Sequence, residues 1–584
     1  MIGLFAVTAA GRSAAAELAR ALGPDAVLVD GPLRASLERL WPQLDAAVFF
    51  LATGATVRLV APLLTDKRTD PGVVCVDEAR RFAVALVGGH DGGANALAAQ
   101  VAAVFEATAV VTTASDATGS TPLDELIAQL DASVDGDLAA AGVALLDGAP
   151  VLLRNPLGFP LPPLPATVAH SHPHPACVIV IDDRLPTTPD DATTLRLVPR
   201  TLTVGIGSVR GVRAGAVAAV LDELTAAGLD PRAVRGYASI DVKSQELGIL
   251  DAVAQHSFFH GGLAEGRDPA TPPPLQTFTA AELSGVAVPN PSDVVAHEVG
   301  TPSVAEASAL RAAAEHGRAE LVLAKVKGDG ATLAVARSRP RGRLAVVGLG
   351  PGAADLRTPR AEAELRRASV VVGLDQYVEQ VRHLLRAGTE IVASGLGDEE
   401  GRAAAAVQLA QQGRAVALIG SGDAGVYAMA SPALEQAGTE IDVVGVPGVT
   451  AALGASAVLG APLGHDHVLI SLSDLHTPWP AILRRVRAAA EGDFVVCFYN
   501  PRSGERDWQL AAALAVLREH RPASTPVGAV RQISRVGQRA WTAPISDFDP
   551  AGVDMLTTVI VGSSSTVLVG GRMVTPRGYA WMPG

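Results

Sequence analysis

Three glycine-rich segments in the second half of the chain have the composition of ligand-binding loops. GLGPG at 348–352, GSGDAGVYAMA at 420–430 and VPGVTAALGAS at 446–456 each follow an apolar run. If those runs are parallel strands, the loops lie at carboxyl ends of strands, where open α/β sheets bind ligands. Asp423 is the one acidic residue among small residues that let a ligand approach the backbone. This pattern favours a neutral or cationic ligand over a triphosphate, and no GxxxxGK[ST] motif occurs.

The first glycine segment does not have the spacing of a dinucleotide site. Its glycines follow GxGxG, and Ala353 stands where GxGxxG requires the last glycine. We expect the next helix to begin at Thr358–Pro359, an N-cap followed by proline at the first helical position. The intervening loop of about six residues is too long to cradle a pyrophosphate on the helix N-terminus. A nicotinamide dehydrogenase is therefore disfavoured and would have to be supported by NAD binding.

The N-terminal half carries a polar cluster of its own. GGHDGGAN at 88–95 follows the apolar run FAVALV, and His90 beside Asp91 has the chemistry of a general base. An N-capping loop with an exposed histidine explains the same residues equally well. Further polar candidates without fixed roles are Lys243, Glu246 and Glu306.

The spacing of apolar runs predicts the elements that position the glycine loops. From Arg343 onward, five apolar runs alternate with helical patterns such as DEEGRAAAAVQLAQQG, which has acids first and Gly413 at its end. Such alternation predicts a parallel sheet covered by helices on both faces. After Gly464 the pattern starts again and ends in strand-rich sequence, which indicates a second α/β lobe with more antiparallel character. Two lobes favour a ligand site between them.

Composition bounds the remaining classes. The 584 residues are 48% hydrophobic and 18% charged, enough to build several cores and unlike a disordered chain. The net charge of −13 argues against nucleic acid as a partner. The uncharged run 443–464 is broken by glycine and proline, so we expect two short buried elements and no membrane span. Three scattered cysteines and an N-terminus without a basic segment predict a reducing, cytoplasmic location.

Two segments resemble linkers. The first, 154–183, is rich in proline, which disfavours a continuing helix or a central strand. It contains His170, His172 and His174, but no carboxylate lies beside them, so we favour a solvated linker and predict no metal site. The second is SRPRG, within 337–343, just before a fresh apolar run.

Five motifs, in order, resemble a known family. GLGPGAADLRTPRAEAEL, GSGDAGVYAMA, VPGVTAALGAS, FYNPRS and TTVIVG are similar to those of the tetrapyrrole (class III) S-adenosylmethionine-dependent methyltransferases, and most closely to the precorrin-3B C17-methyltransferases of cobalamin biosynthesis. The resemblance extends from Arg343 to Gly584. It implies a cofactor, S-adenosyl-L-methionine, folded between two lobes and held largely by backbone groups. It also implies a homodimer formed through this half of the chain.

The resemblance assigns roles to individual residues. Cofactor contacts would be Ser421, Gly422, Asp423, Val426, Thr450, Ala451, Tyr499 and Val559. Val559 could equally be core and Tyr499 a packing aromatic. GLGPG, with Gly350 and Pro351, would line the trough for the tetrapyrrole, whose carboxylates call for arginines. The candidates are Arg502, Arg506, Arg531 and Arg535. Methyl transfer to C17, with ring contraction, needs mainly in-line placement, so a lone catalytic base is not required.

The N-terminal half resembles the cobalt-precorrin-5A hydrolases. GGHDGGAN and TTASDATG are similar to motifs of their N-terminal domain, and G-GS-RG, SID-K--E and VG-PSVAEA-AL to motifs of their C-terminal domain. In that family a lactone of the corrinoid is opened and a two-carbon fragment is released, and His90 would be the catalytic candidate. Ser208 and Val209 stand where family members often carry cysteine and arginine.

These observations predict a multidomain α/β protein. The expected parts are a hydrolase-like N-terminal α/β domain (1–125), a middle region with the proline-rich linker (126–200), a hydrolase-like C-terminal domain (201–338) and the two methyltransferase lobes (343–462 and 463–584). The working hypothesis is a bifunctional enzyme of cobalamin biosynthesis. Two alternatives stay open: an active methyltransferase whose N-terminal half only binds corrinoid, and a corrinoid-binding protein without catalysis. The sequence leaves open whether the macrocycle already carries cobalt.

Overall fold

The computed structural model describes residues 1–66, 69–89, 92–112, 120–187, 193–260, 275–395, 397–504 and 506–578. The chain forms two compact units, one of residues 1–340 with 386–388, the other of residues 341–385 with 389–584. The division after Pro340 falls within the second predicted linker. In the described ranges, no helix is long and apolar enough to cross a membrane.

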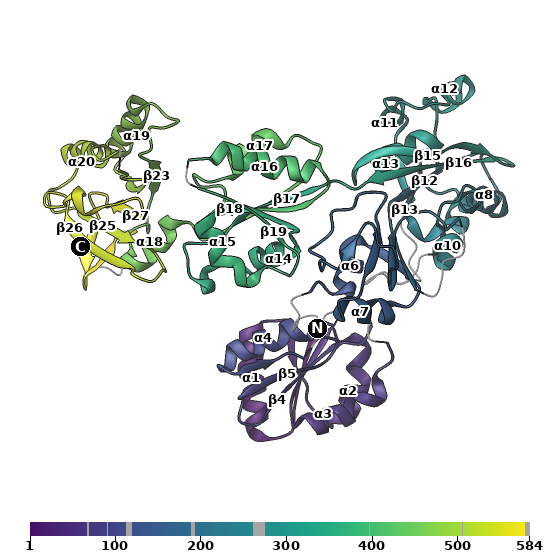
Figure 1. The fold of residues 1–584 in the computed structure, drawn as a ribbon, viewed down its shortest axis with the longest axis horizontal. Coiled ribbons are helices and arrows are strands. Elements are labelled where there is room, and N and C mark those ends of the chain that lie inside the picture. Colours follow the sequence, from purple (N-terminus) through teal and green to yellow (C-terminus); the bar gives the residue numbers. More distant parts are fainter. Residues whose placement is uncertain are drawn as a thin grey trace. The chain divides into compact units, whose positions relative to one another are not determined.

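The first sheet has six strands in the order β2-β1-β3-β4-β5-β6. β1 to β4 are parallel, whereas β5 runs antiparallel to β4 and parallel to β6. Helices α1 and α4 pack on one face, and α2 and α3 on the other (Figure 1). The bounds are β1 (Ile2–Ala6), α1 (Ala9–Leu22), β2 (Ala26–Leu28), α2 (Leu33–Leu40), β3 (Ala46–Phe50), α3 (Thr53–Val60), β4 (Gly72–Val76), β5 (Phe82–Val87), α4 (Ala94–Phe105) and β6 (Thr108–Val110).

The second sheet contains part of the proline-rich segment. Its order is β7-β11-β10-β8-β9, and β10 is the central strand. The prediction that prolines exclude a central strand from 154–183 is therefore wrong, because CVIVI follows the last proline and is itself a buried run. Phe159, Leu161 and Leu164 also pack into this core. The bounds are α6 (Leu123–Leu130), β7 (Ala132–Asp135), α7 (Leu138–Leu146), β8 (Val151–Arg154), β9 (Val168–Ala169), β10 (Cys177–Ile181) and β11 (Thr194–Pro199).

The third sheet has the order β14-β13-β12-β16-β15. Helices α8 and α10 cover one face, and α13 packs so closely on the other that a Cβ on Gly205 would lie 1.9 Å from the carbonyl oxygen of Ala305. The bounds are β12 (Leu202–Ser208), α8 (Ala214–Leu221), α9 (Glu223–Ala226), β13 (Val234–Ile240), α10 (Leu247–His260), β14 (Leu275–Phe278), α11 (Ala280–Ser284), α12 (Asp293–Val299), α13 (Ala305–Ala313), β15 (Arg318–Lys327) and β16 (Ala331–Arg339).

The fourth sheet is the predicted parallel one. Its five strands, in the order β19-β18-β20-β17-β21, all run in the same direction, with α16 and α17 on one face and α14 and α15 on the other. Thr358 caps α14 by accepting a hydrogen bond from Ala361 N at 3.2 Å, which confirms the expected helix start. The bounds are β17 (Arg343–Gly348), α14 (Pro359–Arg367), β18 (Val370–Leu374), α15 (Asp375–Val381), β19 (Glu390–Ser394), α16 (Glu399–Gln411), β20 (Ala415–Gly420), α17 (Ala430–Ala437) and β21 (Asp442–Val446).

The second lobe is built on a mixed sheet in the order β23-β24-β27-β25-β26. Only β23 and β24 are parallel, as expected for a more antiparallel lobe. Helices α19 and α20 pack on one face and α18 on the other. The bounds are α18 (Ala451–Leu459), β22 (Gly460–Ala461), β23 (His467–Ser471), α19 (Trp479–Glu491), β24 (Val495–Tyr499), α20 (Gln509–His520), β25 (Pro526–Arg531), β26 (Arg539–Pro544), β27 (Thr557–Val561), β28 (Val567–Val569) and β29 (Arg572–Val574).

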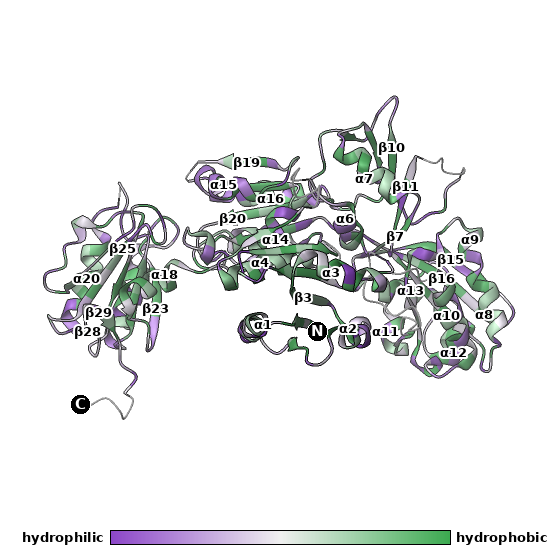
Figure 2. Cartoon of the chain, turned by 90° about the horizontal axis from the view of Figure 1, so that it is seen from below, coloured by the Kyte–Doolittle hydropathy of each residue, from purple (hydrophilic) through white to green (hydrophobic). Residues whose placement is uncertain are grey.

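Hydropathy follows this layering. Figure 2 shows hydrophobic residues concentrated in the strands and polar residues on helices and loops. The uncharged run 443–464 contains most of β21 and all of α18, which confirms two short elements in place of a membrane helix.

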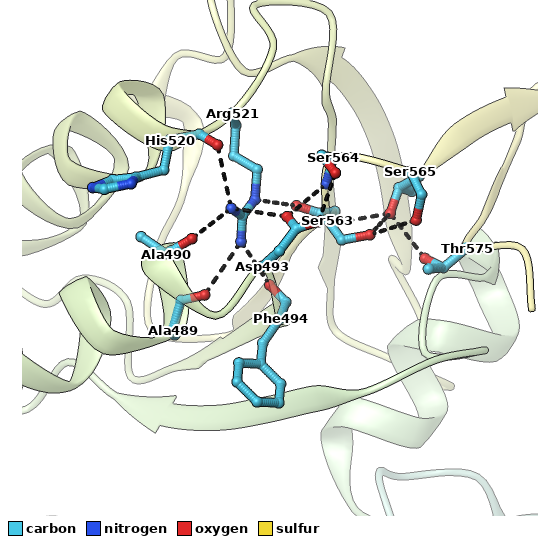
Figure 3. A network of polar contacts seen from close by, with 12 residues as sticks. Ala489, Ala490, Asp493, Phe494, His520, Arg521, Ser563, Ser564, Ser565 and Thr575 are labelled. Carbon is cyan, nitrogen blue, oxygen red and sulfur yellow. Dashed lines mark hydrogen bonds and ion pairs between the residues drawn. The ribbon is translucent and has the colours of Figure 1, made fainter.

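A buried arginine fastens the end of α19 in the second lobe (Figure 3). The side chain of Arg521 is 1% exposed and lies 2.9 Å from the carboxylate of Asp493. It donates to Ala490 O at 2.8 Å and to Phe494 O at 3.0 Å, with longer bonds to the carbonyl oxygens of Ala489, His520 and Gly562. The carbonyls of Ala489 and Ala490 also accept from Phe494 N and Asp493 N, so the guanidinium gives each of these helix-end carbonyls a second donor.

Candidate ligand site in the two-lobed unit

The three glycine loops meet at the carboxyl ends of the parallel strands. β20, β17 and β21 are neighbours, so the loops that follow them lie side by side as predicted. Gly350 N donates to Gly422 O at 3.0 Å, and Gly422 N donates to Gly350 O at 2.8 Å. This reciprocal pair joins the first loop to the second through main-chain atoms alone.

Close packing explains why these positions are glycines. A Cβ on Gly348 would lie 2.7 Å from Gly422 O and 2.8 Å from Gly448 N, and one on Gly448 would lie 2.1 Å from Gly422 O. Gly350 and Gly422 have φ values of +76° and +67°, and residues other than glycine adopt such backbone conformations only at a cost in free energy. We call the segments 348–352, 420–426 and 447–451 the loop cradle. The three loops contact one another through main-chain atoms, and Ser421 and Thr450 add hydroxyl groups to the loop cradle.

Asp423 holds two parts of the loop cradle together. One carboxylate oxygen accepts from Gly425 N at 2.8 Å and the other from Gly448 N at 3.0 Å. The sequence indicated a direct ligand contact for this residue. In the structure both oxygens accept backbone N–H groups, so Asp423 fixes the geometry of the second and third loops.

Tyr499 brings the second lobe to the loop cradle. Its hydroxyl shares a 2.6 Å hydrogen bond with the Thr450 hydroxyl and accepts from Ala452 N at 2.8 Å. Burial raises the pKa of Tyr499 to about 12, so the phenol stays protonated at neutral pH. This tyrosine is therefore a neutral hydrogen-bonding group at the start of α18, where Ala451 is the first helical residue.

A neighbouring tyrosine was not singled out by sequence reasoning. Tyr427 lies at φ +51°, and its ring centroid is 5.3 Å from that of Tyr499. Its hydroxyl donates to Leu469 O on the edge strand β23 at 2.8 Å. The signal was present in GVYAMA, since an aromatic residue among small ones in a ligand loop indicates a specific contact.

The other residues predicted to contact the cofactor or the tetrapyrrole differ in how far they are buried. Val559 lies in β27 with its side chain completely enclosed in the second-lobe core, so the alternative of a core residue describes its side chain. Val426 is half-buried on the second loop, whereas Gly350 and Pro351 are buried. The ring of Pro351 faces α18, where a Cβ on Gly454 would lie 3.6 Å from its Cγ.

The four candidate arginines have different partners. Arg502 donates to Ala551 O at 2.9 Å, and Arg531 is ion-paired with Asp554 at 2.7 Å. Arg506 donates to two backbone carbonyls of its own lobe. Arg535 reaches the loop cradle, where Nε donates to Pro351 O at 2.9 Å and Nη2 to Ser421 Oγ at 3.0 Å.

The part of the chain that contains the loop cradle is similar in sequence to known proteins. Residues 343–549 match the family described as Tetrapyrrole (Corrin/Porphyrin) Methylases. The chain is 45% identical over 242 residues to the "Probable cobalt-factor III C(17)-methyltransferase" of Salmonella typhimurium, covering 99% of that protein and 40% of this chain. The chain belongs to the tetrapyrrole methylase family.

Other methylase relatives match the same part. The Precorrin-3B C(17)-methyltransferase of Sinorhizobium sp is 41% identical, with 98% of it and 41% of this chain covered. The Cobalt-factor III methyltransferase of Priestia megaterium is also 41% identical, but the chain spans only 45% of its length.

The N-terminal half matches two further families. Residues 35–116 match Cobalamin synthesis G N-terminal, and residues 202–336 match Cobalamin synthesis G C-terminus. A methylase is thus joined to cobalamin synthesis G regions in one chain. This confirms the recognition of both halves from their motifs.

Three of the four polar candidates of the N-terminal half lie within the described residues. His90 lies outside the described residues. Lys243 and Glu246 form a 3.1 Å ion pair, and Glu246 also accepts from Gly211 N at 2.9 Å. Glu306 is fully buried and accepts from the backbone and side-chain amides of Asn290 and from Lys325 N, which is a structural role. Within the part of the chain that the structure describes, no cluster of metal ligands occurs.

If β5 were parallel to β4, the glycines that follow β5 would lie beside the carboxyl end of β4. In the structure they lie beside its start. Because β5 is antiparallel to β4, its carboxyl end lies beside the start of β4, and a Cβ on Gly72 would lie 2.0 Å from Gly92 O. This loop is therefore separated from the carboxyl ends of the parallel strands β1, β3 and β4.

Proposed function

We propose that the chain methylates precorrin-3B or cobalt-factor III at C17, with ring contraction, using S-adenosyl-L-methionine. Membership of the tetrapyrrole methylase family and the names of the full-length relatives in Salmonella and Sinorhizobium support this function. The observation that carries it is the loop cradle closed by Tyr499 of the second lobe.

The residues present fit this cofactor. The loop cradle offers main-chain groups together with the hydroxyls of Ser421 and Thr450, and its glycines let the three loops pack closely against one another. The residues that would hold the cofactor are Ser421, Gly422, Asp423, Val426, Thr450, Ala451, Tyr499 and Val559. Asp423 and Tyr499 also position the loops, and Val559 would contribute only through its main chain because its side chain is buried in the core. When bound, its sulfonium supplies the methyl group. The protein's task is then to place the accepting carbon in line and to exclude water, which accounts for a site without a dedicated base.

For the N-terminal half we propose a cobalt-precorrin-5A hydrolase-like role, which makes the chain bifunctional. The matches at 35–116 and 202–336 support it. A corrinoid-binding role without hydrolysis is the competing proposal. Release of a two-carbon aldehyde from cobalt-precorrin-5A separates the two, and its loss in His90→Ala would support the predicted catalytic residue. The five-part domain division, the homodimer and the cytoplasmic location stay predictions.

The methylase proposal is tested by titrating S-adenosylhomocysteine into the full chain by calorimetry. We expect one site per chain. Ala451→Trp should abolish it, because an indole at the first residue of α18 would fill the loop cradle. Ala404→Trp, at an exposed alanine of α16, is the matched control and should bind like the wild type. Absence of binding to the folded wild-type chain would overturn the proposal.

Asp423→Ala should weaken S-adenosylhomocysteine binding by roughly tenfold or more, because the charge-assisted bonds to Gly425 N and Gly448 N are lost. Asp423→Asn keeps one acceptor oxygen, so we expect a smaller loss. Calorimetry measures both constants. Wild-type affinity in the alanine variant would show that the loops keep their geometry without this carboxylate.

A further inference from the structure

Arg535 carries a charge that no partner compensates. Its two hydrogen-bond partners, Pro351 O and Ser421 Oγ, are neutral. Within the described residues, no carboxylate lies within ion-pair distance of it, whereas Arg531, at the end of the preceding strand, is paired with Asp554. A guanidinium has five N–H donors, and these two bonds use only one edge of it. The other edge, Nη1 with the second hydrogen of Nη2, has no partner among those residues.

The turn that carries Arg535 is fixed from several sides. It joins β25 to β26, and both Gln532 (φ +51°) and Ser534 (φ +58°) adopt left-handed conformations. Arg535 N donates to Gln532 O at 3.0 Å, and Ser534 N donates to the side chain of Gln538 at 2.7 Å. Strained backbone of this kind persists only where surrounding contacts over-determine it, and it gathers at functional sites.

The loop cradle makes room for this side chain. A Cβ on Gly352 would lie 2.4 Å from Cγ and 2.7 Å from Nε of Arg535, so the arginine stem rests directly on the glycine. One half-buried side chain from the second lobe therefore contacts both the loop predicted to line the tetrapyrrole trough and the loop predicted to bind the cofactor.

We propose that Arg535 binds a carboxylate of the ligand through the free edge of its guanidinium while the other edge positions Pro351 and Ser421. This inference rests on the proposed function. Both a tetrapyrrole side chain and the amino-acid end of S-adenosylmethionine offer a carboxylate. Arg535 thereby joins ligand recognition to the placement of the loop cradle, and the charge left unpaired in the free protein becomes paired in the complex.

The test titrates three probes into the full chain: S-adenosylhomocysteine, methylthioadenosine, which lacks the carboxylate, and uroporphyrin III, a polycarboxylate tetrapyrrole. We expect Arg535→Gln to weaken binding of the carboxylate-bearing probe by roughly 10- to 100-fold. Methylthioadenosine should lose clearly less affinity, because it feels only the lost contacts of Arg535 to Pro351 and Ser421. Loss with uroporphyrin III assigns the tetrapyrrole carboxylate, and loss with S-adenosylhomocysteine the carboxylate of the cofactor. Arg535→Lys should retain part of the affinity at low salt.

The control is Arg539→Gln, which removes the same charge from an exposed position on β26 and should bind all three probes normally. Two results would overturn the inference: unchanged binding of both carboxylate probes in Arg535→Gln, or an equal loss with methylthioadenosine, which would mean a purely structural role. If the wild-type chain binds none of the probes, the proposed function fails first, and the inference fails with it.

Discussion

Arg521→Met is expected to destabilise the second lobe by about 1–3 kcal/mol, because it removes the hydrogen bonds of a buried guanidinium to backbone carbonyls and to the partly exposed carboxylate of Asp493. Methionine fills a similar length but removes the guanidinium donors from the helix-end carbonyls and from Asp493, which keep only their other partners. Burial lowers the pKa of Arg521 and the carboxylate of Asp493 raises it, with a net lowering, which shows how much desolvation this site imposes. Asp493 also accepts from the amide and hydroxyl of Ser564. If Asp493 shifts in the variant, we therefore expect residues 563–566 to be destabilised as well.

Peptide-resolved hydrogen exchange across residues 467–575 measures this effect within the intact chain, because a global free energy of unfolding is poorly defined for a multidomain protein. Arg487→Met, at an exposed position of α19, is the matched control and should change protection little. Arg521→Lys should fall between the two, since an ammonium has fewer donors and no planar fork. Equal protection in the Arg521 and Arg487 methionine variants would show that the carbonyls find other partners.

Acidification is expected to weaken the third sheet through His256. Burial, and secondarily the positive charge of His260, lowers the pKa of His256 from 6.5 to about 4. The Tyr237 hydroxyl shares a 2.6 Å hydrogen bond with Nδ1 of this ring. Between pH 6.5 and 4 the unfolded chain binds a proton that the folded chain excludes, so stability falls as the pH is lowered. The difference corresponds to about 3 kcal/mol.

His256→Asn tests the origin of this acid sensitivity. Asparagine still accepts from Tyr237 but does not titrate, so hydrogen-exchange protection of β12, β13 and α10 should become nearly independent of pH between 6.5 and 4. His297→Asn, on the exposed face of α12, should keep the wild-type dependence. A wild-type slope in His256→Asn would assign the acid sensitivity to other groups.

Local patterns were enough to predict the parallel sheet of the methylase part. Alternating runs, the cap at Thr358 and the glycine after α16 are signals carried by neighbouring residues. The reversal of β5 depends on pairing between segments and leaves no local trace. The same limit applies to 154–183, where proline content indicated a linker although Phe159 and Leu164 complete a core.

Site residues were predictable as loops and less so as individual side chains. Asp423 was recognised as exceptional, but its role depends on Gly448, which is distant in sequence. The sequence could not rank the four arginines that were candidates for binding tetrapyrrole carboxylates. In the structure, Arg535 is the one of the four that contacts the loop cradle. Apolar residues occupy successive positions of β27, so the sequence alone could not tell whether the side chain of Val559 faces the core or the ligand site.

Close packing of the glycine loops has an evolutionary consequence. At Gly348 and Gly448 any side chain would collide with the main chain of a neighbouring loop, so substitution at these positions cannot retune the loop cradle gradually. Adaptation to a new methyl acceptor must therefore act through side chains delivered from the second lobe. Laboratory selection for altered acceptors should target the turn around Arg535 and leave the glycine loops intact.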